Sequence, residues 1–170
     1  MRDLIMAYLV RKIAMGKWCV SDEVLPINAD AITQCLKTDD NTLSVWRIED
    51  EKEISQGVLA MAASNDFLSK IDVVVVDEAE LETGSITITA TPGKTPCTDL
   101  INTHRDLSSL NVNNLAFISD SIAAQIRADK VHRFTVTKIK ALLLDAINKG
   151  SLDPELLSDS VRAKILKSVS

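Results

Sequence analysis

The sequence predicts an α+β fold, in which a small mixed or antiparallel sheet from the N-terminal two-thirds of the chain packs with a C-terminal helical cluster. Strand-like alternation dominates up to Thr91, whereas helical periodicity dominates after it. The length of 170 residues fits a single domain over 1–170, with a helical subdomain at 113–170 as an alternative. Hydrophobic residues make up 46% of the chain and charged residues 25%, so the composition excludes a disordered protein.

Four segments have the pattern of strands. Residues 8–18 (YLVRKIAMGKW) combine aromatic and β-branched residues and favour a strand over a helix. Residues 42–48 (TLSVWRI) place apolar side chains on both faces in alternation. Residues 71–76 (IDVVVV) form the continuous run expected of a strand that is covered on both sides. Residues 85–91 (SITITAT) follow a turn at Gly84 and alternate Ile with Thr, as a half-buried strand does.

Helical patterns lie between these strands and after them. Residues 28–37 predict a short helix that an Asn or Asp caps at its start. Asp50 and Glu53 have the spacing of a capping box, which predicts a helix over 51–64. Residues 95–107 predict a further helix, with four residues on one side: Leu100, Ile101, His104 and Leu107.

The last third of the chain predicts three more helices. Asn113 or Asn114 caps the first, and its apolar spacing continues to Ile126. Residues 130–134 then form a connector or a short edge strand. Residues 135–150 predict a helix that Gly150 ends, and an Asp-Pro pair at 153–154 caps the last one.

Charge and cysteine content restrict where the protein works and what it binds. The net charge is −5, but residues 121–170 carry nine Lys or Arg against five Asp or Glu, which leaves −9 for the first 120 residues. Three cysteines cannot form a complete set of intrachain disulfides, and their spacing matches no zinc site. We therefore expect a cytoplasmic protein without a metal or cofactor. No apolar stretch approaches the length that would cross a membrane.

One string fits the catalytic loop of protein kinases, H-R-D-L-x-x-x-N, over residues 104–111. In a kinase the Asp of this string positions the substrate hydroxyl. A Gly-rich phosphate loop is absent upstream, and the chain is too short for two kinase lobes. The interpretation we favour is an amphipathic helix, with His104 and Asp106 kept as catalytic candidates.

A second set of candidates resembles parts of a P-loop ATPase. The buried run 71–76 ends in Asp77 and Glu78, as does the strand whose acid helps to hold magnesium. Residues 92–95 (PGKT) include the Gly-Lys-Thr of a phosphate loop. The leading glycine is missing and the acid precedes the loop, so the motif is incomplete. Lys94 joins the two acids as a candidate.

Cys97 and His104 are a nucleophile and a base by residue type. On one helix they lie two turns apart, roughly 10 Å, because an α-helix rises about 1.5 Å per residue. Proton transfer requires hydrogen-bond contact, so the predicted helix excludes this pair.

The basic segment 127–140 is the candidate interaction surface, through five residues: Arg127, Lys130, Arg133, Lys138 and Lys140. It precedes two predicted helices, an outline compatible with a helix-turn-helix on phosphates. The sequence favours a non-catalytic accessory subunit that docks on another protein or on its own copy, such as an immunity, antitoxin or defence-system component. The alternatives are a small nucleotide-processing enzyme or toxin, and a nucleic-acid-binding regulator that uses the C-terminal helices.

Overall fold

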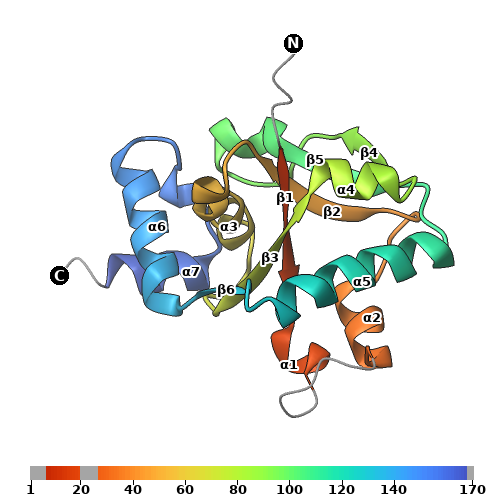
Figure 1. Ribbon diagram of the computed structural model, residues 1–170. Coiled ribbons are helices and arrows are strands. Elements are labelled where there is room, and N and C mark those ends of the chain that lie inside the picture. Colours follow the sequence, from red (N-terminus) through yellow and green to blue (C-terminus); the bar gives the residue numbers. More distant parts are fainter. Residues whose placement is uncertain (1–6, 20–26, 168–170) are drawn as a thin grey trace.

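The computed structural model describes residues 7–19 and 27–167, and its centre is a six-stranded antiparallel sheet (Figure 1). The strand order is β4-β5-β2-β1-β3-β6, so β4 and β6 are the two edges. This arrangement confirms the α+β class. The strands are β1 (Tyr8–Ile13), β2 (Leu43–Ile48), β3 (Ile71–Asp77), β4 (Thr87–Ala90), β5 (His104–Ser108) and β6 (His132–Phe134).

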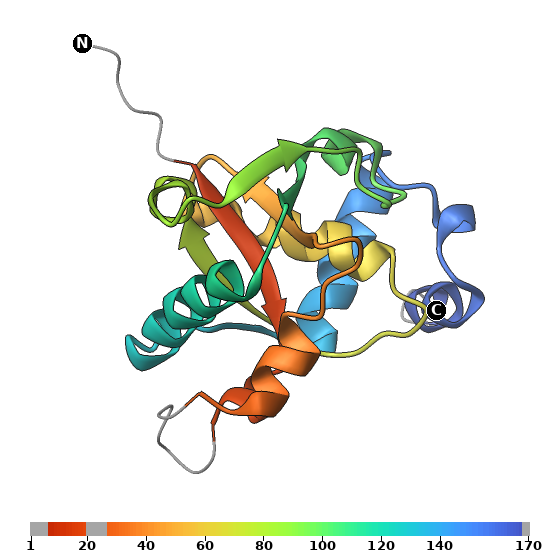
Figure 2. The same cartoon turned by 90° about the vertical axis from the view of Figure 1, so that its right-hand side faces the viewer.

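Helices cover both faces of the sheet, as the two views in Figures 1 and 2 show. The first face packs against α3 (Ile54–Ala63), α6 (Val136–Asn148), α7 (Asp159–Leu166) and the 3₁₀ helix η2 (Thr98–Thr103). The second face packs against α1 (Met15–Trp18), α2 (Ala29–Cys35), α4 (Glu78–Thr83) and α5 (Val112–Arg127). Two further 3₁₀ turns are η1 (Glu51–Glu53) and η3 (Pro154–Leu156).

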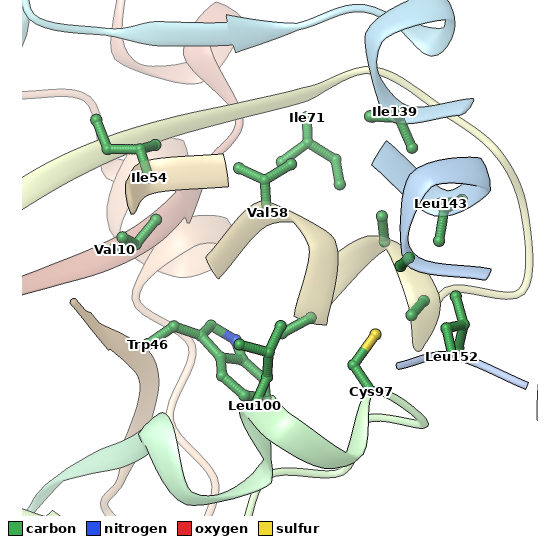
Figure 3. Packing of buried hydrophobic residues seen from close by; sticks show 14 of the residues in the cluster. Val10, Trp46, Ile54, Val58, Ile71, Cys97, Leu100, Ile139, Leu143 and Leu152 are labelled. Atoms are coloured by element: carbon green, nitrogen blue, oxygen red, sulfur yellow. The ribbon is translucent and has the colours of Figure 1, made fainter. Parts of the chain in front are cut away.

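The core on the first face lies between the sheet, α3 and α6 (Figure 3). Val10 of β1 and Trp46 of β2 meet Val58 of α3, and Leu143 of α6 packs behind α3. The alternation predicted for residues 42–48 is confirmed, because Leu43 and Val45 belong to the other core while Trp46 and Ile48 belong to this one.

Most predicted elements are present with small shifts at their ends. The strand predicted over 8–18 ends at Ile13 and is followed by the single turn α1. Six residues after β3 form α4, where only a turn was predicted, because Asp77 caps it by accepting from the Ala79 amide at 2.9 Å. Residues 132–134 are the edge strand β6, one of the two predicted alternatives.

Two predictions in the second half of the chain are wrong. The helix predicted over 95–107 is η2 followed by β5, which pairs with both β2 and β4. The last helix begins at Asp159, because Ser158 caps it by accepting from the Val161 amide, whereas Asp153 caps only η3.

The last third of the chain contributes to both layers. Helix α5 lies on the second face of the sheet, whereas α6 and α7 lie on the first. The division into a helical subdomain over 113–170 stays a prediction. Within residues 7–19 and 27–167, no helix has both the length and the apolar composition to span a bilayer.

Candidate functional site

Two adjoining hollows lie at the end of the sheet where β1 finishes. The first has a volume of 660 Å³ and is lined by residues of β1, α1, α2, β3 and β6. The second has a volume of 520 Å³ and is lined by residues of β1, β2, β5, the end of α3 and the segment after β4. Arg11 and Lys12 line both, so the two hollows meet at β1.

The hollows open where β1 and β2 separate. The register of β1 with β2 covers Tyr8 to Val10 only, whereas β1 stays paired with β3 through Ile13. The guanidinium of Arg11 bridges the gap, since it donates to the Ser44 carbonyl at 2.7 Å and to the Cys35 carbonyl. Arg11 therefore ties α2 to the two central strands and places a positive charge between the hollows.

The surroundings of Arg11 are polar on one side and apolar on the other. Its Nε atom is buried and has no hydrogen-bond partner among the residues that the structure describes. Desolvation by the surrounding protein lowers the pKa of Arg11 below its ordinary value. This side chain nevertheless stays charged at neutral pH, because an arginine pKa lies far above 7.

Positive charge is concentrated around both hollows, although the chain as a whole carries −5. Seven basic residues line them against three acidic ones, a local net charge of +4. Among the described residues, none of Lys12, Lys37, Lys70 and Lys94 has an ion-pair partner within 4 Å. The basic residues are Arg11, Lys12, Lys17, Lys37, Lys70, Lys94 and Arg133, and the acids are Asp39, Asp72 and Asp106.

Asp72 and Arg133 form a two-bond ion pair at the first hollow. Nε and one terminal nitrogen of Arg133 donate to the two carboxylate oxygens of Asp72, at 2.8 and 3.1 Å. The Asp72 side chain is only 5% exposed, so the pair compensates a buried charge. Hydrogen bonding to Asp72 raises the pKa of Arg133. The pair thus anchors β6 to β3. Lys17 is paired with Asp30 at 3.5 Å, which leaves Lys12 and Lys70 as the lysines of this hollow without an ion pair among the described residues.

A hydrogen-bonded chain of three side chains lies beside the second hollow. The Thr91 hydroxyl donates to Oδ2 of Asp106 at 2.9 Å and lies 2.8 Å from Nδ1 of His104. A hydroxyl has one hydrogen, so Thr91 must accept from a protonated Nδ1. In a neutral His104 ring, Nε2 is then the acceptor nitrogen. The ring also contacts Trp46 edge to face, with centroids 5.0 Å apart.

The loop predicted to cradle phosphate has a packing role. Gly93 lies against the indole of Trp46: a Cβ atom there would come within 2.8 Å of Cζ3. The Gly93 amide donates to the Ile101 carbonyl at 2.8 Å, so the loop is held on η2. The glycine lets the backbone approach Trp46, and the adjacent Lys94 then lines the second hollow.

The structure brings together three of the five catalytic candidates. Lys94, His104 and Asp106 line the second hollow. Asp77 and Glu78 do not, because Asp77 lies four residues from Val73, the partner of Lys12, about 13 Å along the strand. Asp77 caps α4, and Glu78 accepts from Nε of Arg47 at 3.0 Å. Both acids have structural partners at the far end of β3.

Of the five residues predicted as an interaction surface, Arg133 alone lines either of these two hollows. Arg127 ends α5, Lys130 follows it, and Lys138 and Lys140 lie on α6. Ten residues, 149–158, separate α6 from α7. A helix-turn-helix uses a turn of three or four residues, so these two helices do not form one.

The pattern of the sequence did not single out Arg11, Lys12, Lys37 or Lys70. A weak signal exists at Arg11, since it interrupts an apolar strand between Leu9 and Ile13. Alternate residues of a strand share a face, so a charged residue between two apolar ones is buried with them. Its charged group then needs a hydrogen-bond partner. The lysines carry no such signal, because they are ordinary surface residues until the fold places them side by side.

Cys97 is a core thiol and not a reactive one. The helix that would have separated it from His104 does not form, but Cys97 is 1% exposed within the first core (Figure 3). Desolvation by burial raises the pKa of Cys97 above its ordinary value of 9.0. The thiol therefore stays protonated, and the thiolate that would act as nucleophile is disfavoured.

This burial predicts a loss of stability in alkali. The folded state holds the Cys97 proton more tightly than the unfolded chain does. The protonated thiol therefore contributes to the free energy of unfolding below pH 9.0, and this contribution is lost as the pH rises through the raised pKa. We expect the free energy of unfolding to fall above that pH, less steeply in Cys97→Ala. Urea titrations across the alkaline range measure both slopes. Equal slopes, or labelling of Cys97 by a thiol reagent as fast as the half-buried Cys19, would contradict this assignment.

Within the described part of the chain, no three His, Cys, Asp or Glu side chains gather as a metal site would require. Comparisons with protein-family models, with curated proteins and with solved structures found no match to this chain, so its own residues carry the argument on function.

Proposed function

We propose that the protein binds a phosphorylated small molecule of several negative charges, of the size of a nucleoside di- or triphosphate, in the second hollow. The observation that carries this proposal is the positive charge of the second hollow, which four basic residues line against two acidic ones in a chain whose net charge is −5. Unpaired lysines attract phosphate as compact point charges. Arg11 adds a fixed charge at the junction of the hollows.

The dimensions of the second hollow support a small ligand. Its 520 Å³ falls within the range of small-molecule sites, roughly 300–1,000 Å³. Lys37, Lys94 and Lys12 supply positive charge, while Asp39 and Asn65 supply acceptors for hydroxyl or amino groups. The lining thus combines groups for phosphates with groups for the rest of a nucleotide.

The burial of Trp46, which lines the second hollow, favours a small ligand over single-stranded nucleic acid. Trp46 is 7% exposed, and both Gly93 and His104 pack against its ring. Proteins that bind single strands stack bases on exposed aromatic faces. The hollow offers charge and hydrogen bonds without such a stacking surface.

Removing two lysines tests the site. We expect Lys37→Ala/Lys94→Ala to raise the Kd for ATP by at least about 100-fold, since each of the two lysines would lose a hydrogen bond to a charged group and such a bond contributes about 1.5–3 kcal/mol. Isothermal titration with ATP, ADP and inorganic triphosphate measures the change. Affinity of the native protein should fall with added salt, because exposed charges are screened.

The matched control removes two exposed lysines elsewhere, in Lys52→Ala/Lys138→Ala, which changes the net charge equally. We expect its Kd to stay close to that of the native protein. Equal losses in both variants would assign the effect to overall charge. Tighter binding of a single-stranded oligonucleotide than of ATP would favour the nucleic-acid regulator instead, and no binding of any of these probes would refute the proposal.

The docking role predicted from the sequence remains a second proposal, and the free edge of β4 supports it. A cytoplasmic location also belongs to the proposal. It is supported by the three cysteines, all of which are free thiols, as expected in a reducing compartment.

A further inference from the structure

The two edges of the sheet differ in how they are protected. Edge strand β6 has three residues, and one of them is Arg133. Edge strand β4 has four residues, Thr87–Ala90, all uncharged, and three of the four are exposed. Figure 2 shows β4 running along one margin of the molecule. Charged residues, prolines or bulges usually protect a sheet edge from pairing, and β4 has none of them.

The hydrogen bonds within the sheet determine which groups of β4 point outward. The Thr91 amide donates to the His104 carbonyl of β5, and Thr89 stands opposite Asp106 in the same ladder. In an antiparallel pair, alternate residues exchange hydrogen bonds with the partner. Odd-numbered residues of β4 therefore bond to β5, and the amides and carbonyls of Ile88 and Ala90 face away from the sheet.

We propose that β4 pairs with β4 of a second copy of this chain, antiparallel and about a two-fold axis through Thr89. This register places Ile88 opposite Ala90 of the second copy at both ends. Each of these two pairs exchanges two bonds, which satisfies the outward groups of both residues. Thr89 then stands opposite its own copy, as a cross-strand threonine pair.

A second copy fits this edge because the contact is self-complementary in charge. The four uncharged residues of β4 meet their copies without repulsion. The register is also self-complementary in hydrogen bonds, since a second copy supplies by symmetry the outward groups of Ile88 and Ala90 that this strand needs as partners.

Such a pairing has a consequence for the candidate site. If the two-fold axis is perpendicular to the sheet, the first faces of both copies lie on the same side of the joined sheet. Thr91, His104 and Asp106 lie next to β4 in the ladder, so the two second hollows would open on the same side of the joined sheet. The inference does not depend on what ligand these hollows bind.

Proline at position 90 tests the backbone contact. The Ala90 amide makes no bond to β5 in this ladder, so Ala90→Pro removes an outward donor and leaves the monomer's sheet paired. We expect the native protein to show a concentration-dependent monomer–dimer equilibrium in sedimentation. Ala90→Pro should raise the dimer dissociation constant at least about tenfold.

A charge-swap pair tests the position of the axis, even if Ala90→Pro does not fold. Thr89→Lys and Thr89→Glu each place like charges opposite each other in a homodimer, so each alone should sediment as a monomer. Their equimolar mixture should form dimers again. A native protein that stays monomeric at all concentrations, a dimer unaffected by these variants, or a mixture that fails to associate would each overturn the proposal.

Discussion

Replacing Trp46 by alanine is expected to lower the free energy of unfolding by about 3–5 kcal/mol. The side chain is 7% exposed and packs among Val10, Gly93 and His104. Its loss leaves a cavity under the floor of the second hollow. Since small domains have a total stability of about 5–15 kcal/mol, urea titration should show a much lower midpoint.

Gly93 provides the control for this packing. Gly93→Ala adds one methyl group against the outer indole ring, and overpacking of this kind costs about 1–3 kcal/mol. Phenylalanine lacks that outer ring, so the alanine should cost less in a Trp46→Phe background. A double-mutant cycle measures the coupling. Strict additivity would show that Gly93 and Trp46 do not constrain each other.

Replacing Arg11 by alanine is the second large effect we expect, a loss of about 2–4 kcal/mol, because two carbonyl groups lose their donors and a half-buried side chain is removed. The bonds from Arg11 to the carbonyls of Ser44 and Cys35 hold α2 against β1 and β2. Thermal and urea unfolding measure the loss. Ligand affinity should fall as well, since the charge between the two hollows disappears.

Two further substitutions separate these roles. Arg11→Lys keeps the charge but not the fork that reaches two carbonyls at once. It should lose stability while retaining much of the ligand affinity. Arg11→Met keeps an unbranched apolar side chain but not the charge, and should lose affinity. If all three variants changed stability and affinity in constant proportion, the charge of Arg11 would have no separate part in binding.

Elements set by local patterns were predictable from the sequence. The run 71–76 is buried on both faces as predicted, because continuous β-branched residues suit a central strand. The helix from Val136 to Asn148 begins after Thr135, which caps it, and ends before Gly150, whose φ of 74° needs little energy in glycine. In both cases neighbouring residues alone specify the structure.

Residues 98–108 show where local patterns fail. Leu100, His104 and Leu107 have helical spacing, yet His104 begins β5. The same segment also alternates, with His104 and Asp106 on one face and Leu107 on the other. Pairing with β2 on one side and β4 on the other makes the strand more stable than the helix. Such long-range pairing overrides local propensity and cannot be read from the segment itself.

The charge distribution shows the same limit. By sequence the last 50 residues are the basic part of the chain, yet six of the seven basic residues at the hollows come from the first 94 residues. Lysines distant in sequence meet because β1 lies between β2 and β3, and because α2 and the loop after β4 fold over the same end of the sheet.

The sequence by itself determined the α+β class, the ends of α2, α3 and α6 to within a few residues, and which faces of the central strands are apolar, since these depend on residues within a few positions of one another. Only the tertiary structure decided the strand order, the unprotected edge at β4 and the gathering of positive charge around two hollows. Each of these depends on contacts between segments far apart in the chain. The residues next to a charge or an unpaired amide in the sequence do not indicate which groups will lie beside it in space.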